Sequence, residues 1–151
     1  MADTTVQLRM EKWVLEKGLP AQHGLCLKPG RRTLQWGGSF DFDGISGDGE
    51  TVACISTATA RTATGRPAVG KYHKIRSDAL FLLHAVGATR QVLVFTDKAM
   101  ADHFRSDQER GRFPNKIEIL WVRPSLGMDR RLASARAVAS QEVSPRASGK
   151  E

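Results

Sequence analysis

Hydrophobic residues recur at the spacing of one helix face in three segments of the chain. The first segment, Thr5–Lys17, predicts a helix that ends at Gly18 and Pro20. The other two, Gly70–Val86 and Lys98–Glu109, predict helices in the second half of the chain. The apolar positions that define the three faces are Val6, Met10, Trp13 and Val14, then Tyr72, Ile75, Ala79, Leu82, Leu83 and Val86, and finally Met100, Ala101 and Phe104.

Short runs with the pattern of β-strands lie between these helices. Thr33–Trp36 predicts a strand that follows a loop over residues 21–32, and two more strands are expected within residues 37–59. Gln91–Phe95 is a short apolar run rich in β-branched residues, which is typical of a buried strand, and Ile117–Val122 predicts another strand after Pro114 and Asn115. The order of elements is therefore αβββαβαβ, which predicts an α/β fold with a central mixed β-sheet flanked by helices.

Two acidic residues stand out within residues 37–59, because Asp41 and Asp43 alternate with Phe40 and Phe42. Side chains two positions apart on a strand point to the same face, so the two carboxylates are expected on one surface. If residues 47–50 form a four-residue hairpin loop, the register of the hairpin can be counted back from the loop. The expected partners are Ser46 with Thr51, Asp43 with Cys54, and Asp41 with Ser56.

Length and composition indicate one globular domain. The chain has 151 residues, of which 40% are hydrophobic and 26% charged, and no apolar run reaches the length of a membrane span. We expect a disordered N-terminus over residues 1–4, a folded domain over 5–124 and a basic, partly disordered extension over 125–151. A cytoplasmic location with free cysteines is expected by default, since the N-terminus lacks an export signal.

The charge is strongly positive and unevenly distributed. The net charge is +7, and residues 70–151 carry 15 basic and 9 acidic side chains, which gives +6. Such a field favours nucleic acid through phosphate contacts and counterion release, although a basic surface can also serve solubility alone. DNA is the expected partner, no membrane partner is expected, and a homodimer or a partner subunit remains open.

A stretch of small and hydroxyl residues over 57–71 carries Arg61, Arg66 and Lys71, and Lys74 follows on the predicted helix. These four residues are the candidate nucleic-acid ligands, because a polar basic segment at the start of a helix suits a phosphate backbone. The alternatives are a disordered connection for the stretch and a solvated pair for the two lysines.

The element order and the acidic second strand resemble the PD-(D/E)XK, or restriction-endonuclease-like, superfamily over about Thr5–Val122. In that family an aspartate on the second strand and an acid-X-lysine motif on the third hold one or two divalent cations. The resemblance implies that Asp41 or Asp43 holds Mg²⁺, with Mn²⁺ as a substitute. The acid position of the motif falls on Cys54 and the lysine position on Ser56, so Lys71 or Lys74 is expected to supply the missing cation.

These features predict a metal-dependent nuclease-like hydrolase, in which Asp41 and Asp43 bind the metal and Asp43, Lys71 and Lys74 are catalytic. It would act as an endonuclease on DNA phosphodiester bonds. The alternative is a catalytically inactive nucleic-acid-binding or protein-interaction module of the same fold. Glu11 is interpreted as a solvated helix charge.

Overall fold

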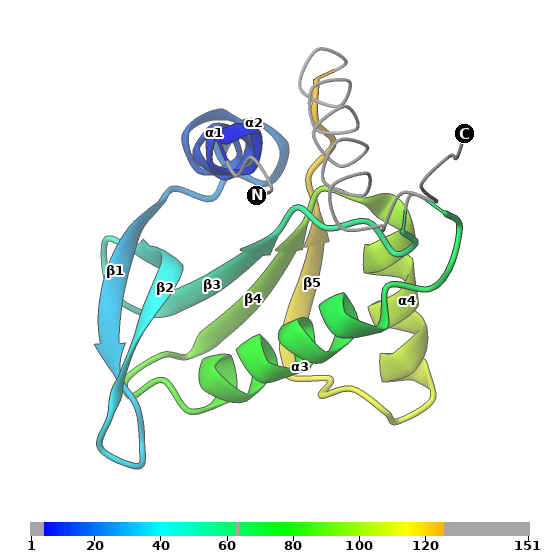
Figure 1. Ribbon diagram of the computed structural model, residues 1–151. Helices are drawn as coiled ribbons and strands as arrows, with labels where there is room; N and C mark the ends of the chain where they lie inside the picture. Colours follow the sequence, from blue (N-terminus) through cyan, green and yellow to red (C-terminus); the bar gives the residue numbers. More distant parts are fainter. Residues whose placement is uncertain (1–4, 63, 126–151) are drawn as a thin grey trace, which may run out of the picture.

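A computed structural model describes residues 5–62 and 64–125 of the chain. Helices and strands follow one another in the order that the sequence predicts (Figure 1). The helical elements are α1 (Thr5–Trp13), the π-helix η1 (Val14–Gly18), α2 (Leu19–His23), α3 (Val69–Leu83) and α4 (Lys98–Glu109). The strands are β1 (Leu27–Thr33), β2 (Ser39–Ser46), β3 (Thr51–Ser56), β4 (Arg90–Phe95) and β5 (Ile117–Trp121).

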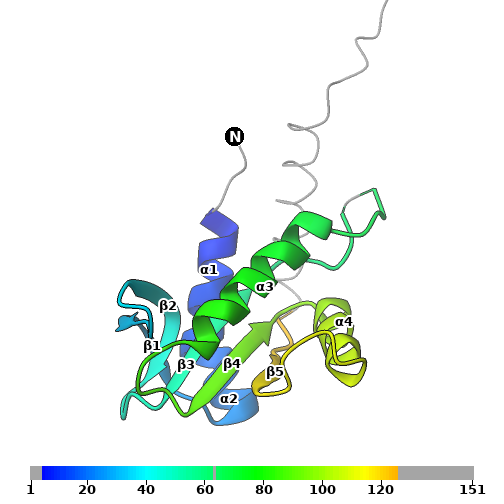
Figure 2. The same ribbon diagram turned by 90° about the horizontal axis from the view of Figure 1, so that it is seen from below.

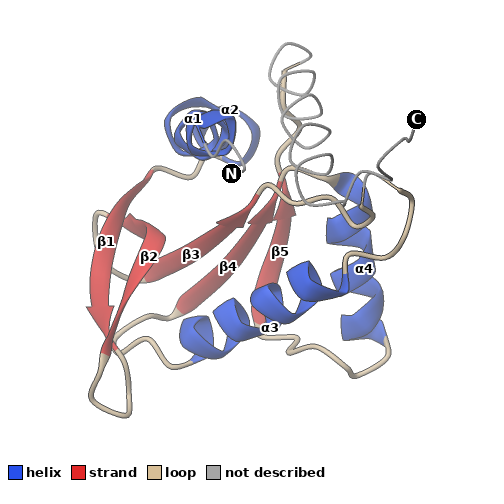
Figure 3. Cartoon of the chain, in the orientation of Figure 1, coloured by secondary structure: helices blue, strands red, loops and turns tan. Residues whose placement is uncertain are grey.

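The five strands form one mixed sheet in the order β1-β2-β3-β4-β5. The first three strands pair antiparallel, whereas β3, β4 and β5 pair parallel. Parallel neighbours need a crossover connection, and α3 and α4 provide the two that this sheet requires. The predicted α/β class, with a central mixed sheet flanked by helices, is confirmed (Figure 3).

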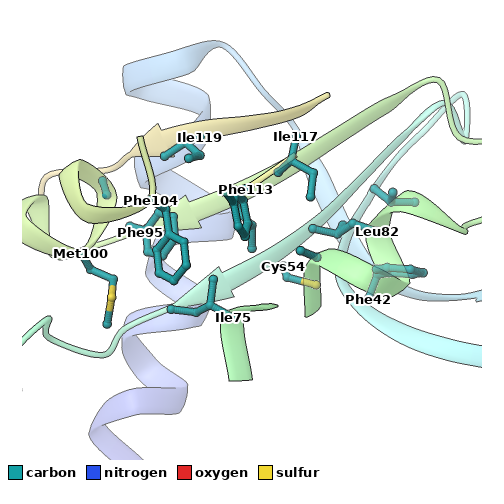
Figure 4. Close-up of a cluster of buried hydrophobic side chains, with 14 of the residues drawn as sticks. Phe42, Cys54, Ile75, Leu82, Phe95, Met100, Phe104, Phe113, Ile117 and Ile119 are labelled. Carbon is teal, nitrogen blue, oxygen red and sulfur yellow. The ribbon is translucent and has the colours of Figure 1, made fainter. Parts of the chain in front are cut away.

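The sheet buries apolar side chains on both faces. Helices α3 and α4 cover one face, where Phe95, Phe104 and Met100 are fully buried (Figure 4). Segments η1 and α2 cover the other face, where Val14 and Leu19 pack. Strand β3 alternates between the two cores, because Val52 and Cys54 belong to the first and Ala53 and Ile55 to the second. A strand covered on both faces reads as a continuous apolar run.

The N-terminal helix does not end where the sequence predicts. Helical structure continues through η1 and α2 to His23. Gly18 is needed there for close packing, since a Cβ at this position would lie 2.6 Å from Val122 Cγ1. Pro20 stands in the first turn of α2, directly after the π-helical turn in which Leu19 N donates to Val14 O.

The first strand also differs from the prediction. Strand β1 begins at Leu27, within the segment expected to be a loop, and ends at Thr33, where the strand was expected to begin. The prediction was wrong because Pro29 and Gly30 are typical of loops. An edge strand and a bulge both accommodate proline, and β1 has both features. The later elements match the predicted ranges within three residues, and α4 matches its range in full.

The predicted register of the β2–β3 hairpin is confirmed where the strands pair, at Gly44 with Ala53 and at Ile45 with Val52. The ladder covers these two pairs, so the expected pairs of Asp43 with Cys54 and Asp41 with Ser56 lie beyond it. On the other side of β2, Lys28 pairs with Ile45 and Gly30 with Phe42. Pro29 therefore faces both Asp43 and Gly44, which is a β-bulge.

A bulge twists its strand and redirects a side chain, and here it acts on Asp43.

The predicted terminal segments, residues 1–4 and 126–151, lie outside the described residues. Within the described residues, no helix is long and apolar enough to cross a membrane.

Candidate functional site

Asp43 lies where β2 and β3 stop pairing, and its carboxylate takes the place of a backbone acceptor. The Ile55 N–H on β3 donates to Asp43 Oδ2 at 2.7 Å. Burial raises the pKa of Asp43, and the charge of Asp78 raises it further, whereas the Ile55 hydrogen bond and Lys74 lower it. The net direction is upward, so this carboxylate is held in an environment that disfavours its charge.

Asp78 is the second carboxylate of the site and comes from the middle of α3. Only 9% of the residue is exposed. Lys74, one turn earlier on the same helix, lies with Nζ 3.1 Å from Asp78 Oδ2. Burial raises the pKa of Asp78 more than the charge and hydrogen bond of Lys74 lower it.

Lys74 connects the two aspartates electrostatically. Partial burial lowers the pKa of its ammonium, but the charge of Asp78, the hydrogen bond to it and the charge of Asp43 outweigh that effect. The resulting pKa lies above the ordinary value, so Lys74 is a cation across the physiological range. Its side chain remains 70% exposed, which leaves the ammonium accessible to a ligand.

Glu11 brings the N-terminal helix into the same site. Burial raises the pKa of Glu11, the charge of Asp43 raises it further, and Lys74 lowers it. Helices α1 and α3 lie on opposite faces of the sheet (Figures 1 and 2). The charges of Asp43 and Lys74 both act on the Glu11 carboxylate, so this residue lies within electrostatic range of the two.

Cys54 on β3 is only 2% exposed and is acted on by the charges of Asp78, Asp43 and Lys74. Burial raises the pKa of its thiol well above the ordinary value, and the charges of Asp78 and Asp43 add to that rise. The residue is therefore a neutral thiol at physiological pH, and a neutral thiol is neither a nucleophile nor a metal ligand. Cys54 stands at the position where the resemblance to the PD-(D/E)XK superfamily would require an acid.

We call Glu11, Asp43, Lys74 and Asp78 the acidic cluster. It draws on α1, β2 and α3, which are far apart in the sequence. Within residues 5–62 and 64–125, no three histidine, cysteine, aspartate or glutamate side chains form a group that could hold a metal ion by themselves. The cluster thus offers carboxylate oxygens to a metal ion, but it does not supply a complete set of protein ligands.

Asp41, a predicted metal ligand, is not brought to the acidic cluster. It faces Arg31 across the β1–β2 ladder, with Arg31 Nε 2.8 Å from Asp41 Oδ1 and Nη2 3.3 Å from Oδ2. The side chain is 72% exposed, and the hydrogen bond with Arg31 lowers its pKa. The bulge at Asp43 and Gly44 explains the different surroundings of the two aspartates, because it interrupts the regular alternation of the strand at Asp43, whereas Asp41 lies in the regular ladder.

The segment over residues 57–68, here called the basic loop, carries Arg61 and Arg66, and both are exposed. The loop is fixed at Ala60, whose N–H donates to Asp97 Oδ2 at 2.9 Å and whose carbonyl accepts the Tyr72 hydroxyl at 2.8 Å. Asp97 also caps α4 through Met100 N. The described part of the loop is therefore anchored to α3 through Tyr72 and to the start of α4 through Asp97. Lys71, which is exposed, follows the loop on α3.

Two members of the acidic cluster, Asp78 and Glu11, were not predicted as site residues from the sequence. Asp78 stands three residues after Ile75 and four before Leu82, so it interrupts the buried stripe of α3. An acid inside an apolar stripe was the available signal, and the Lys74–Asp78 spacing was a second one. No comparable signal marked Glu11, because its partners come from other elements.

Comparisons of the chain with protein-family models, with curated proteins and with solved structures find no significant match.

Proposed function

We propose that the chain is a metal-dependent nuclease-like protein that acts on the phosphodiester bonds of DNA. The observation that carries the proposal is the acidic cluster, in which Asp43 and Asp78 keep raised pKa values beside the ammonium of Lys74. Groups with pKa values raised by burial and by like charge are typical of catalytic sites. The basic loop and the net charge of +7 add attraction for a polyanion.

Asp43 and Asp78 are the residues that would hold Mg²⁺, or Mn²⁺ in its place. Mg²⁺ prefers hard oxygen ligands and is commonly bound by one or two carboxylates together with substrate phosphates and water, so it does not require a group of three protein ligands. A cation would also relieve the repulsion by which Asp78 raises the pKa of Asp43. When bound, the metal supplies charge stabilisation and a water of lowered pKa.

Asp78 replaces Asp41 in this proposal, since Asp41 is exposed and paired with Arg31. Asp78 also fills the role of the motif acid that is missing at Cys54, from a helix rather than from β3.

Lys74 is suited to stabilise negative charge on the phosphate, because its ammonium is a permanent cation beside both aspartates. Lys71 and the arginines of the basic loop are suited to bind flanking phosphates.

A second candidate function is a nucleic-acid-binding module without catalysis. It is favoured by a specific observation: Lys74 already neutralises Asp78 at 3.1 Å, and the described residues form no metal group of three. Such a module would bind DNA with strong salt dependence and would not cleave it.

Nicking of supercoiled plasmid DNA in Mg²⁺, in Mn²⁺ and in chelator separates these functions. We expect nicking by the wild-type protein with either metal and none in chelator. The Asp43→Asn variant should lose nicking, since its amide still accepts the Ile55 hydrogen bond but carries no charge. The matched control is Asp41→Asn on the same strand, which should keep the wild-type rate. Salt-sensitive binding without nicking in either metal would support the non-catalytic module instead.

A further inference from the structure

Trp36 is an exposed aromatic residue that is held firmly in place. It lies in the turn between β1 and β2, and 53% of the residue is accessible to solvent. Backbone hydrogen bonds fix the turn: Gln35 N donates to His84 O at 2.9 Å, and Leu34 N donates to Gly38 O at 2.7 Å. The exposed ring is therefore attached to the C-terminal end of α3 rather than to a free hairpin.

A ladder of aromatic rings supports Trp36 from the core outward. Phe42 is buried, Phe40 lies 4.8 Å from it between ring centroids, and Phe81 stacks on Phe40 at 4.4 Å. Trp36 then lies 6.1 Å from Phe81 and 4.7 Å from His84. Rings that are already ordered lose little conformational entropy when a ligand stacks on them.

This aromatic surface continues the cationic face of α3. Lys74, Ser77, Phe81 and His84 follow one another at three- or four-residue spacing, so they lie along one side of the helix. At 1.5 Å per residue, Lys74 and His84 are about 15 Å apart along the axis. This side of the helix therefore begins at Lys74, the cation of the acidic cluster, and ends beside the exposed Trp36.

We propose that Trp36, with His84 and Phe81 behind it, is a stacking platform for an unpaired base of the nucleic-acid strand whose phosphates bind at Lys71 and Lys74. The inference rests on the proposed function, because it assigns the occupant of the platform from the positive charge of α3. A cationic track joined to an ordered aromatic ring is the combination by which proteins hold single strands, with the charge binding phosphates and the ring accepting any base. The proposed substrate class is thus DNA with an unpaired segment.

The test is a titration in chelator, which prevents cleavage, with two oligomers of equal phosphate number. One is oligothymidylate and the other is an abasic oligomer that has the same backbone and no bases. We expect oligothymidylate to quench the tryptophan fluorescence of the wild-type protein, and we expect the abasic oligomer to bind without that quenching. The Trp36→Phe variant identifies the part of the signal that comes from Trp36.

The Trp36→Ala variant should bind oligothymidylate about tenfold more weakly and the abasic oligomer with unchanged affinity, because it loses a base contact and no phosphate contact. Its unfolding midpoint reports whether the hairpin is intact. Equal affinity of Trp36→Ala and wild type for oligothymidylate would overturn the inference alone. A wild-type protein that binds neither oligomer would overturn the proposed function as well. A change of molecular mass in Trp36→Ala, with unchanged oligomer binding, would assign the surface to self-association instead.

Discussion

Replacing Asp43 by asparagine should stabilise the fold while it abolishes the proposed activity. The pKa of Asp43 is raised by burial and by Asp78, so its ionised form lowers the free energy of unfolding at neutral pH. Asparagine has nearly the same shape and can still accept the hydrogen bond from Ile55 N. The substitution therefore removes an unfavourable charge without opening a cavity.

The size of the effect follows from linkage. Each pKa unit by which the folded state exceeds the unfolded state costs about 1.4 kcal/mol at neutral pH. Single stabilising substitutions commonly raise the free energy of unfolding by about 0.5 to 2 kcal/mol. For a domain of this size, about 1 kcal/mol corresponds to an increase of about 4 °C in the unfolding midpoint.

The pH dependence has a definite sign. Because the folded-state pKa of Asp43 is raised, the folded state binds its proton more readily than the unfolded state does. Asp43 therefore destabilises the wild-type protein above its folded-state pKa. This cost is removed as the pH falls from that value to the ordinary pKa of an aspartate. Asp43→Asn should have its largest advantage at neutral pH and lose it over that interval.

Chemical denaturation of both proteins, followed by circular dichroism at several pH values, measures this difference. Asp41→Asn is the matched control, since the pKa of Asp41 is lowered by its hydrogen bond with Arg31 and its replacement should give no gain at neutral pH. An Asp43→Asn protein that is no more stable than wild type at neutral pH would refute the assignment of Asp43 to a strained, charge-disfavouring position.

Two further predictions concern the close packing at Gly18 and the attachment of the basic loop. Gly18→Ala should lower the free energy of unfolding by about 1 to 3 kcal/mol, because a Cβ there would lie 2.6 Å from Val122 Cγ1. Gly47→Ala, where a Cβ would meet nothing within 4 Å, should leave denaturation nearly unchanged, and equal effects of the two would contradict this packing. Tyr72→Phe should increase trypsin cleavage of the basic loop and weaken DNA binding, because it removes the 2.8 Å hydrogen bond to Ala60 O. Unaltered cleavage would mean that this bond does not hold the loop.

Local signals in the sequence were sufficient to predict most elements of the fold. The apolar runs of β3 and β4 identify strands buried on both faces, and Asp97 identifies the start of α4, where it accepts a hydrogen bond from Met100 N. The prediction of strand β1 failed because proline and glycine are typical of loops. An edge strand tolerates both residues, and β1 is an edge of this sheet. Edge position is a property of the whole sheet.

The candidate site was predictable only in part, for the same reason. Asp43 was found because a strand alternates, but its separation from Asp41 depends on a bulge that strand periodicity does not encode. Asp78 was not predicted as a site residue, because its burial follows from how α3 lies on the sheet. The involvement of Glu11 depends on α1 lying within electrostatic range of Asp43 and Lys74, which no local pattern determines.

Asp43 and Asp78 are proposed to act in one site despite their separation in the sequence. The most direct test is the rate of plasmid nicking in Mn²⁺ by Asp78→Asn, measured beside wild type and Asp41→Asn. Asparagine keeps the shape of Asp78 and an acceptor for Lys74, so the loss of a metal-binding charge is the main change. We expect nicking by Asp41→Asn at the wild-type rate and a loss of at least a hundredfold in Asp78→Asn, about 2.7 kcal/mol of transition-state stabilisation. A wild-type rate in Asp78→Asn would contradict this proposal.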